Sequence, residues 1–225
     1  MRPINKGKNN KKFKKYPDAK PDLTERLGNY CSYCEMRLPA SLAVEHVQPK
    51  VIHPELRLEW DNFLLGCTNC NSTKGDSKIK VEEYLWPDKD NTFLAFVYNE
   101  GGRITVNSKL DEKQRKCAQS ILDLVGLQKQ PGVIGLKNTD YRWRDRKEQW
   151  DAATRAFERL KNNDTKALRE QIVETAYGGG HWSIWMTVFK NDGDMLKRFI
   201  DKFPGTSMEC FDDMGVPIPR KNGIV

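Results

Sequence analysis

Apolar residues in the second half of the chain recur at helical spacing. Ile121 and Val125 follow Cys117 at four-residue intervals, and Gly126 stands where that helix would end. Similar spacing predicts three more helices, near residues 143–157, 168–176 and 182–190, with Asn163 and Asp164 as candidate caps for the second of these. Aromatic residues in this pattern are more typical of a bundle core than of a base-stacking surface. Residues 108–225 are therefore predicted to be a mainly helical region that binds a partner or substrate.

A different pattern precedes this region. The stretch TFLAFVYNEGGRITV at residues 92–106 contains two runs of strand-forming residues around an Asn-Glu-Gly-Gly turn, which predicts a β-hairpin. Upstream, residues 28–80 contain two cysteine pairs, and residues 1–27 are rich in lysine. The sequence thus divides into a basic N-terminal arm (1–27), a small cysteine-containing domain (28–80), a hairpin connector (81–107) and the helical region (108–225). The predicted fold class is α+β.

Composition places the chain among ordinary globular proteins. Of its 225 residues, 38% are hydrophobic and 31% are charged, which argues against a disordered chain. The most apolar stretch, residues 182–189, is too short to cross a bilayer. The cationic N-terminus lacks the apolar run of a secretory signal. We therefore expect a cytoplasmic protein that does not bind a membrane.

The net charge of +7 is concentrated at the N-terminus. Residues 1–20 carry eight lysine and arginine residues against the single carboxylate of Asp18, so they account for the whole excess. Such an arm attracts phosphate backbones through counterion release, without reading base sequence. A solvated disordered tail accounts for the same composition equally well. The charge alone therefore does not decide the function.

Four of the six cysteines form two C-x2-C pairs, Cys31 with Cys34 and Cys67 with Cys70. Each two-residue gap lets both thiolates converge on one ion, and two such turns supply the four sulfur ligands of a tetrahedral zinc. Because four sulfurs leave no open position, we expect one structural zinc per chain. A thioredoxin-like redox motif needs only one pair, set in a βαβ pattern that this sequence does not show. The two remaining cysteines are interpreted as small buried hydrophobic residues.

A second pattern surrounds the later cysteine pair. It consists of Glu45 and His46 in VEHVQPK, Asn62 in WDNFLLGC, and Asn71 directly after the last cysteine. The run CSYCE…VEHVQPK…WDNFLLGCTNCNSTKG, over about residues 30–75, resembles the HNH endonuclease family in its zinc-supported form. The resemblance implies the ββα-metal fold, in which a β-hairpin and a helix hold one catalytic metal. It also implies that residues 28–80 are a zinc-bound HNH nuclease domain that hydrolyses DNA phosphodiester bonds.

The same resemblance assigns roles to individual residues. His46 is the general base, and Asn62 is the asparagine that fixes the metal-site loop and the base by hydrogen bonds. Asn71 stands where many members have a final histidine, which makes the chain an HNN-type variant, and Glu45 stands where aspartate is common. A neutral imidazole can accept a proton from water, and a hard cation such as Mg²⁺ or Mn²⁺ prefers oxygen ligands. Glu45 and Asn71 are thus the expected ligands of the catalytic cation.

Two lysines and the strand geometry extend this prediction. Lys50 and Lys74 are expected to contact phosphates beside the cleaved bond. Adjacent side chains of a strand point to opposite faces, so Glu45 and His46 would need a bend between them to serve one site. The sequence therefore predicts tight, irregular backbone directly after Glu45. The other two histidines, His53 and His181, match no position of the motif and are treated as structural or substrate-adjacent.

Each of these residues could also have an ordinary structural role. His46 fits a half-buried strand, and Asn62 can cap a turn. Asn71 can form a turn, and Glu45 can be a surface carboxylate. The alternative function is accordingly a non-catalytic zinc module that binds nucleic acid or a protein partner. The combination of Glu45, His46 and Asn71 favours the nuclease, because a pure binding module does not need all three at motif spacing.

The layout of the whole chain resembles a bacterial group of HNH proteins. An MRPxxKG-like start, the cysteine and histidine core, and a PGT…CF…G-P stretch near the end carry this resemblance. The group includes the nuclease subunit of Septu anti-phage defence systems, which works beside an SMC-like ATPase. The resemblance implies that the helical region holds an SMC-like ATPase. Because the chain carries no recognisable base-reading element and its cationic arm does not distinguish bases, we expect DNA contacts along the backbone with little base readout. We also expect assembly as a homo- or hetero-oligomer.

Overall fold

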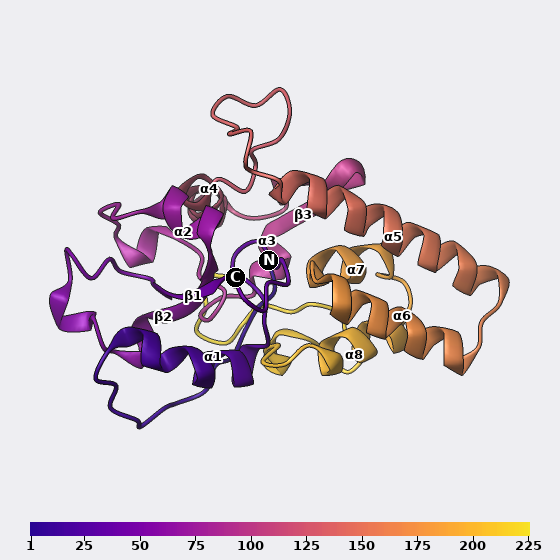
Figure 1. Ribbon diagram of the computed structural model, residues 1–225. Coiled ribbons are helices and arrows are strands. Elements are labelled where there is room, and N and C mark those ends of the chain that lie inside the picture. The colour runs from indigo at the N-terminus through magenta and orange to yellow at the C-terminus, as the bar shows by residue number, and fades with distance from the viewer.

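The computed structural model describes residues 1–225, and the predicted ββα motif lies on one side of it (Figure 1). Strand β1 (Leu42–His46) pairs antiparallel with β2 (Phe63–Cys67), and α2 (Thr68–Lys74) follows directly. Every residue of β2 is buried, because one face of this strand packs on the core and the other on α2. The ββα arrangement that the sequence implied is confirmed.

The rest of the chain is mainly helical, as predicted. A hairpin of β3 (Phe96–Asn99) and β4 (Arg103–Val106) is confirmed at the expected turn, and the short helix α3 (Thr92–Ala95) precedes it. The remaining helices are α1 (Lys20–Leu27), α4 (Glu112–Val125), α5 (Arg142–Asn162), α6 (Lys166–Gly179), α7 (Trp182–Val188) and α8 (Gly193–Lys202). None of these helices is long and apolar enough to cross a bilayer.

The helix ends follow local capping chemistry. Helix α4 ends at Gly126, which takes a left-handed conformation with φ of 64°, as the sequence predicted. Helix α6 begins after Thr165, whose hydroxyl accepts the backbone N–H of Leu168 at 3.2 Å. The cap expected at Asn163 or Asp164 is therefore placed at least one residue too early. Helix α8 was not predicted, although its buried residues recur at helical spacing: Met195, Leu196, Phe199 and Ile200.

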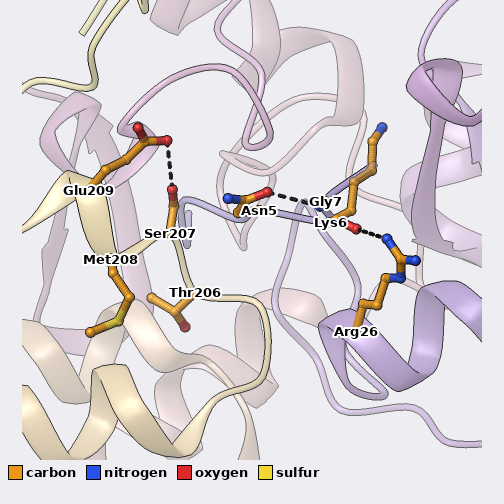
Figure 2. Close-up of a pocket in the computed structure, with 8 residues that line it drawn as sticks. All are labelled: Asn5, Lys6, Gly7, Arg26, Thr206, Ser207, Met208 and Glu209. Atoms are coloured by element: carbon orange, nitrogen blue, oxygen red, sulfur yellow. Dashed lines mark hydrogen bonds between the residues drawn. The ribbon is translucent and has the colours of Figure 1, made fainter. Parts of the chain in front are cut away.

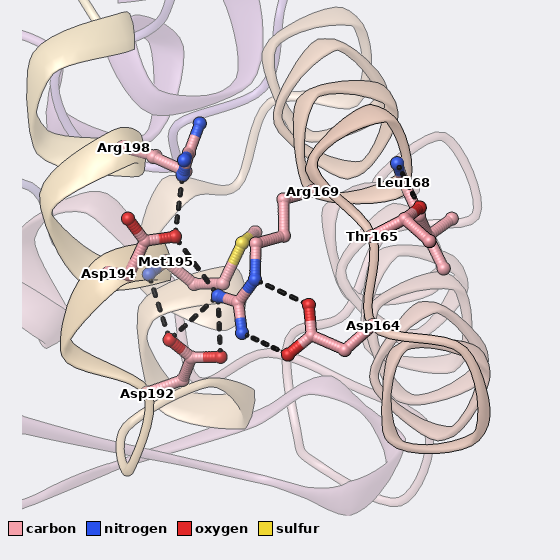
Figure 3. A network of polar contacts seen from close by, with 8 residues as sticks. All are labelled: Asp164, Thr165, Leu168, Arg169, Asp192, Asp194, Met195 and Arg198. Carbon is pink, nitrogen blue, oxygen red and sulfur yellow. Dashed lines mark hydrogen bonds and ion pairs between the residues drawn. The ribbon is translucent and has the colours of Figure 1, made fainter.

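A polar network ties α6 to the start of α8 (Figure 3). The guanidinium of Arg169 on α6 forms ion pairs with Asp164 at 2.7 Å, Asp192 at 2.9 Å and Asp194 at 3.0 Å. Asp192 is also the N-cap of α8, where it accepts the backbone N–H of Met195 at 3.1 Å. The network therefore fixes the relative position of two helices in the C-terminal half.

One apolar core joins the two halves of the molecule. The buried hydrophobic side chains form a single cluster that includes both Met1 and Val225. The two chain ends lie together in the middle, between β1 and β2 on one side and α5 to α8 on the other (Figure 1). The four segments predicted from the sequence thus share one core. The boundaries predicted between these segments stay predictions.

The first residues of the chain are packed, which differs from the predicted basic arm. The buried Arg2 guanidinium donates to the carbonyl oxygens of Leu27 and Pro204, both at 2.8 Å. The Lys6 ammonium forms an ion pair with Asp88 at 3.0 Å. These two cations are used inside the fold and are not free to bind phosphate. Five others remain on the surface: Lys8, Lys11, Lys12, Lys14 and Lys15.

Candidate active site

Glu45 and His46 are the last two residues of β1 and point to opposite faces of the β1–β2 hairpin. Both pair with β2 in an unbroken register, so the predicted bend between Glu45 and His46 is wrong. The strand ends one residue later, and the backbone bends at Val47. Glu45 therefore faces α2, and His46 faces the segment that precedes α1. The strand therefore separates the two side chains, and both residues are buried.

The imidazole of His46 is held in one orientation. Its Nε2 lies 3.0 Å from the carbonyl oxygen of Arg57. Because a carbonyl can only accept, Nε2 carries the proton and Nδ1 keeps a free lone pair. The rings of Tyr16 and Phe63 pack edge-on against the imidazole, with ring centroids 4.9 and 5.2 Å away. Burial lowers the pKa of His46, so the ring is neutral at neutral pH and Nδ1 can accept a proton.

Glu45 is buried beside the ammonium group of Lys74. The Lys74 Nζ lies 2.9 Å from Glu45 Oε1 and donates a 2.7 Å hydrogen bond to the carbonyl oxygen of His46. Burial raises the pKa of Glu45, and the charge of Lys74 opposes that shift. The Lys74 side chain is only 1% exposed, so its ammonium does not reach a phosphate on the surface. This corrects the phosphate contact predicted for Lys74, which instead holds Glu45 and the end of β1.

Asn71 approaches Glu45 from α2 across a glycine. A Cβ added to Gly66 would lie 3.0 Å from the Cβ of Glu45 and 3.7 Å from the Cβ of Asn71, so the missing side chain lets the two residues come close. The Glu45 Oε1 atom is buried and, apart from its ion pair with Lys74, accepts no hydrogen bond. A buried carboxylate with spare oxygen lone pairs beside an amide fits a divalent cation with oxygen ligands, such as Mg²⁺ or Mn²⁺.

Asn62 fixes the loop that follows β1. Its Oδ1 accepts the backbone N–H of Gln48 at 2.8 Å, and its Nδ2 donates to the carbonyl oxygens of Gln48 and Leu56, at 2.9 and 3.3 Å. The loop leads directly to Arg57, whose carbonyl orients His46. Asn62 therefore acts on the imidazole through the loop and makes no hydrogen bond to it. Its part in catalysis stays a prediction.

Aromatic residues hold the N-terminal segment against the β1–β2 hairpin beside His46. Phe13 packs with its ring centroid 6.2 Å from Trp60, and Tyr16 packs against His46. The Lys50 ammonium lies 4.2 Å from the centroid of the Tyr16 ring, a cation–π contact. Residues 8–16, which we call the basic loop, are therefore held beside this hairpin at Phe13 and Tyr16. Aromatic packing holds the basic loop in this position, and the charge pattern of the sequence did not indicate that position.

The four paired cysteines converge as predicted. Their sulfur atoms are buried and lie within 4.8 Å of one another, with Cys34 Sγ 3.6 Å from Cys67 Sγ. Zinc–sulfur bonds of about 2.3 Å in a tetrahedron require sulfurs about 3.8 Å apart, so this cluster can hold a zinc ion. Two backbone N–H groups already donate to the sulfurs: that of Cys67 to Cys31 Sγ at 3.3 Å, and that of Cys70 to Cys67 Sγ at 3.4 Å. Cys67 is also the N-cap of α2 and Cys70 lies within that helix, so two of the four cysteines are fixed to the helix that carries Asn71.

The other two histidines make local contacts. His181 is buried, and its Nε2 lies 2.7 Å from the Asp145 carboxylate, which joins α7 to α5. His53 lies in the loop after β1, with Nδ1 3.1 Å from Glu55 Oε1. Their contacts are those of structural residues, and neither packs against His46.

A hollow between the N-terminal segment and residues 206–209 is a separate feature (Figure 2). It has a volume of about 620 Å³ and is lined by Asn5, Lys6, Gly7, Arg26, Thr206, Ser207, Met208 and Glu209. Its polar groups are largely bonded within the chain. Arg26 donates to the Lys6 carbonyl at 2.7 Å, and Ser207 donates to Glu209 at 3.2 Å. No predicted site residue lines this hollow, so we assign it no role in cleavage.

Comparison with known proteins agrees with this geometry. Residues 31–77 match the HNH endonuclease family, and this segment contains both cysteine pairs, β1, β2 and α2. The chain thus carries an HNH endonuclease domain, as its sequence implied. Over 77 residues it is also 39% identical to the Septu protein PtuB of Bacillus thuringiensis, a match that covers 33% of this chain and 30% of that protein. The chain therefore aligns with less than a third of the relative's length.

Proposed function

We propose that this protein is a metal-dependent endonuclease that hydrolyses DNA phosphodiester bonds. The observation that carries the proposal is the end of β1, where consecutive residues supply a buried carboxylate with spare oxygen lone pairs and, on the opposite face, a neutral imidazole with a free Nδ1. The match of residues 31–77 to the HNH endonuclease family supports the same reaction. His46 accepts a proton from the attacking water at Nδ1. The Arg57 carbonyl then stabilises the imidazolium through its hydrogen bond to Nε2–H.

The remaining residues hold the cation and the loop. Glu45 and Asn71 supply oxygen ligands for Mg²⁺ or Mn²⁺, and Lys74 keeps Glu45 in place from the buried side. When bound, the cation neutralises charge on the phosphate and stabilises the departing oxygen. Asn62 holds the loop whose last carbonyl orients His46. The structural zinc in the four-cysteine cluster fixes the start of α2 and hence the position of Asn71.

We further propose that the nuclease is the effector of a bacterial anti-phage defence system. The similarity to a Septu protein supports this role. The working partner would be an SMC-like ATPase, bound through the helical region that lies outside residues 31–77. The exposed lysines of the basic loop, together with Lys50, are expected to contact the DNA backbone, because cationic side chains bind phosphate without reading base sequence. Target choice then depends on the partner or on the state of the DNA.

Cleavage of supercoiled plasmid tests the proposed reaction. Zinc-loaded protein is expected to convert the plasmid to open-circular or linear DNA with Mg²⁺ or Mn²⁺, and to give no product in EDTA, because hydrolysis needs the oxygen-ligated cation. The reactions are compared with and without the ATPase partner, by gel analysis over time. Loss of cleavage under all conditions, with zinc bound and the partner present, would favour the zinc-containing binding module over the nuclease.

Lys50 provides a separate test of the DNA interface. The substitution Lys50→Gln is expected to weaken DNA binding to the same extent for all sequences. It should also reduce the slope of log affinity against log salt by about 1, because one phosphate contact is lost. Fluorescence anisotropy with Ca²⁺ in place of Mg²⁺ measures binding apart from cleavage. Lys166→Gln, at an exposed cation on α6, is the matched control. If the two variants have the same salt slope, Lys50 does not contact phosphate.

A further inference from the structure

Arg142, the first residue of α5, is buried beneath the four-cysteine cluster. Its side chain is 2% exposed, yet all five N–H groups of its guanidinium have partners. Nε and Nη2 donate to the two oxygens of Asp140, at 2.8 and 2.7 Å. Nη1 and Nη2 donate to the last carbonyls of α4, those of Val125 at 2.7 Å and Gly126 at 3.1 Å. The fifth N–H, on Nη1, donates to the sulfur of Cys70 at 3.1 Å.

The chemistry of the cluster explains why a guanidinium stands there. Four thiolates around one Zn²⁺ carry a net charge of −2, and this charge is buried. Burying an uncompensated charge is costly, whereas a charge-assisted hydrogen bond to one of the thiolates offsets part of the cost. Arginine suits the position better than lysine, because only its planar fork reaches a sulfur, a carboxylate and two carbonyls at once.

We propose that Arg142 is a positioning residue of the four-cysteine site. It holds the Cys70 thiolate in place by a hydrogen bond, so that retention of the metal depends on the contact between the end of α4 and the start of α5. The inference rests on the fit of the cluster to zinc and does not depend on nuclease activity. The chain leaves the nuclease domain, runs through α4 and the long protruding loop at residues 126–141, and returns to the cluster at Arg142 (Figure 1). The metal centre thereby fixes where the long helix α5 begins.

The neighbouring Arg146 offers a matched comparison. It lies one turn later on α5 and is equally buried, and it donates to the carbonyl oxygens of Gly102 at 2.9 Å and Leu127 at 2.8 Å. It makes no hydrogen bond to a sulfur, and its Nη1 has no partner. Loss of either arginine removes a buried guanidinium from the same region. Only loss of Arg142 removes a hydrogen bond to a metal ligand.

The experiment measures the rate at which the protein loses zinc to an excess of a colorimetric chelator. Wild type is compared with three variants, Arg142→Met, Arg142→Lys and Arg146→Met, at a temperature where each is folded. We expect Arg142→Met to lose zinc about 10- to 100-fold faster than wild type, the usual cost of removing a hydrogen bond to a ligand. The rate of zinc loss from Arg142→Lys should be intermediate, since lysine keeps the positive charge but lacks the planar guanidinium. Arg146→Met should stay within about threefold of wild type. Wild-type rates in both Arg142 variants, or equal acceleration in Arg146→Met, would overturn the proposal.

Cobalt substitution gives a spectroscopic measurement that would not change if Arg142 only supported the fold. In the Co²⁺-loaded protein, the sulfur-to-metal charge-transfer band reports the electron density on the thiolates. Removal of the Nη1–H donor should shift this band to lower energy in Arg142→Lys and leave it unchanged in Arg146→Met. If Arg142→Met does not fold, the band of Arg142→Lys decides the question. An unshifted band together with a wild-type rate of zinc loss would contradict the assignment.

Discussion

Replacing His46 by alanine is expected to lower the rate of DNA cleavage at least about 100-fold, the lower end of the contribution of a positioned general base. In the proposed reaction Nδ1 of His46 is the proton acceptor, because Nε2–H is committed to the Arg57 carbonyl. Alanine leaves the cation ligands in place but removes the group that activates water. The rate is measured under single-turnover conditions with saturating Mn²⁺ or Mg²⁺, so that chemistry is separated from binding.

A second histidine provides the control for this prediction. His53→Ala removes an imidazole from the loop that follows β1, where the ring contacts only Glu55 at 3.1 Å. This variant should cleave DNA at the wild-type rate. Zinc content should be unchanged in both variants, because neither histidine contacts a cysteine of the cluster. Equal cleavage by His46→Ala and wild type would remove His46 from the mechanism. Loss of cleavage together with loss of zinc would instead indicate a folding defect.

Replacing Cys67 by serine is expected to remove the metal and most of the folding stability of the nuclease domain. Structural zinc contributes on the order of 10 kcal/mol to the folding of small zinc domains, which is comparable to the whole stability of a typical domain. Cys67 is a special case among the four, since its sulfur also caps α2 by accepting the N–H of Cys70. Elemental analysis should show about one zinc per wild-type chain and almost none in the variant. Circular dichroism should show a lowered melting temperature.

Cys117→Ser is the matched control for the zinc site. Cys117 is buried on α4 and outside the cluster, so this variant should keep its zinc and lose only a little stability, by about 1 kcal/mol, for the buried hydroxyl. A Cys67→Ser protein that is fully loaded with zinc and melts like wild type would refute the four-sulfur site. Both variants change one sulfur to oxygen, so the comparison isolates the effect of metal coordination.

Lys74 shows how tertiary contacts can change the interpretation of a motif residue. A lysine three positions after a candidate metal ligand is easily read as a phosphate contact. In the structure its ammonium is buried between the Glu45 carboxylate and the carbonyl of His46. One cation therefore contacts the side chain of Glu45 and the backbone of the next residue, His46. Lys74 thus connects the Glu45 side chain to the backbone of His46, while the imidazole itself stays on the other face of the strand.

The residues missed by sequence analysis are those that act through distant packing. Tyr16 and Arg57 hold the imidazole of His46, and Arg142 reaches the sulfur of Cys70 from 72 positions away. No spacing rule connects these residues to the motif, since their contacts depend on how the N-terminal segment and α5 fold back on the nuclease domain. A tyrosine next to a proline, or an arginine in a charged helix, is common in proteins and indicates no particular site. Only the tertiary fold brings these side chains to the site.

The sequence by itself determined the ββα motif, the four-cysteine cluster, the hairpin and most of the helices, because each depends on local spacing: two residues between thiolates, alternation along a strand, and helical periodicity. The catalytic roles that it assigns to Glu45, His46, Asn62 and Asn71 stay predictions. Only the tertiary structure decided how those side chains are used: that Lys74 is buried, that the basic segment is packed beside His46, and that Glu45 and His46 face opposite ways. Such outcomes depend on contacts between residues far apart in the chain, where burial and charge pairing outweigh local preference.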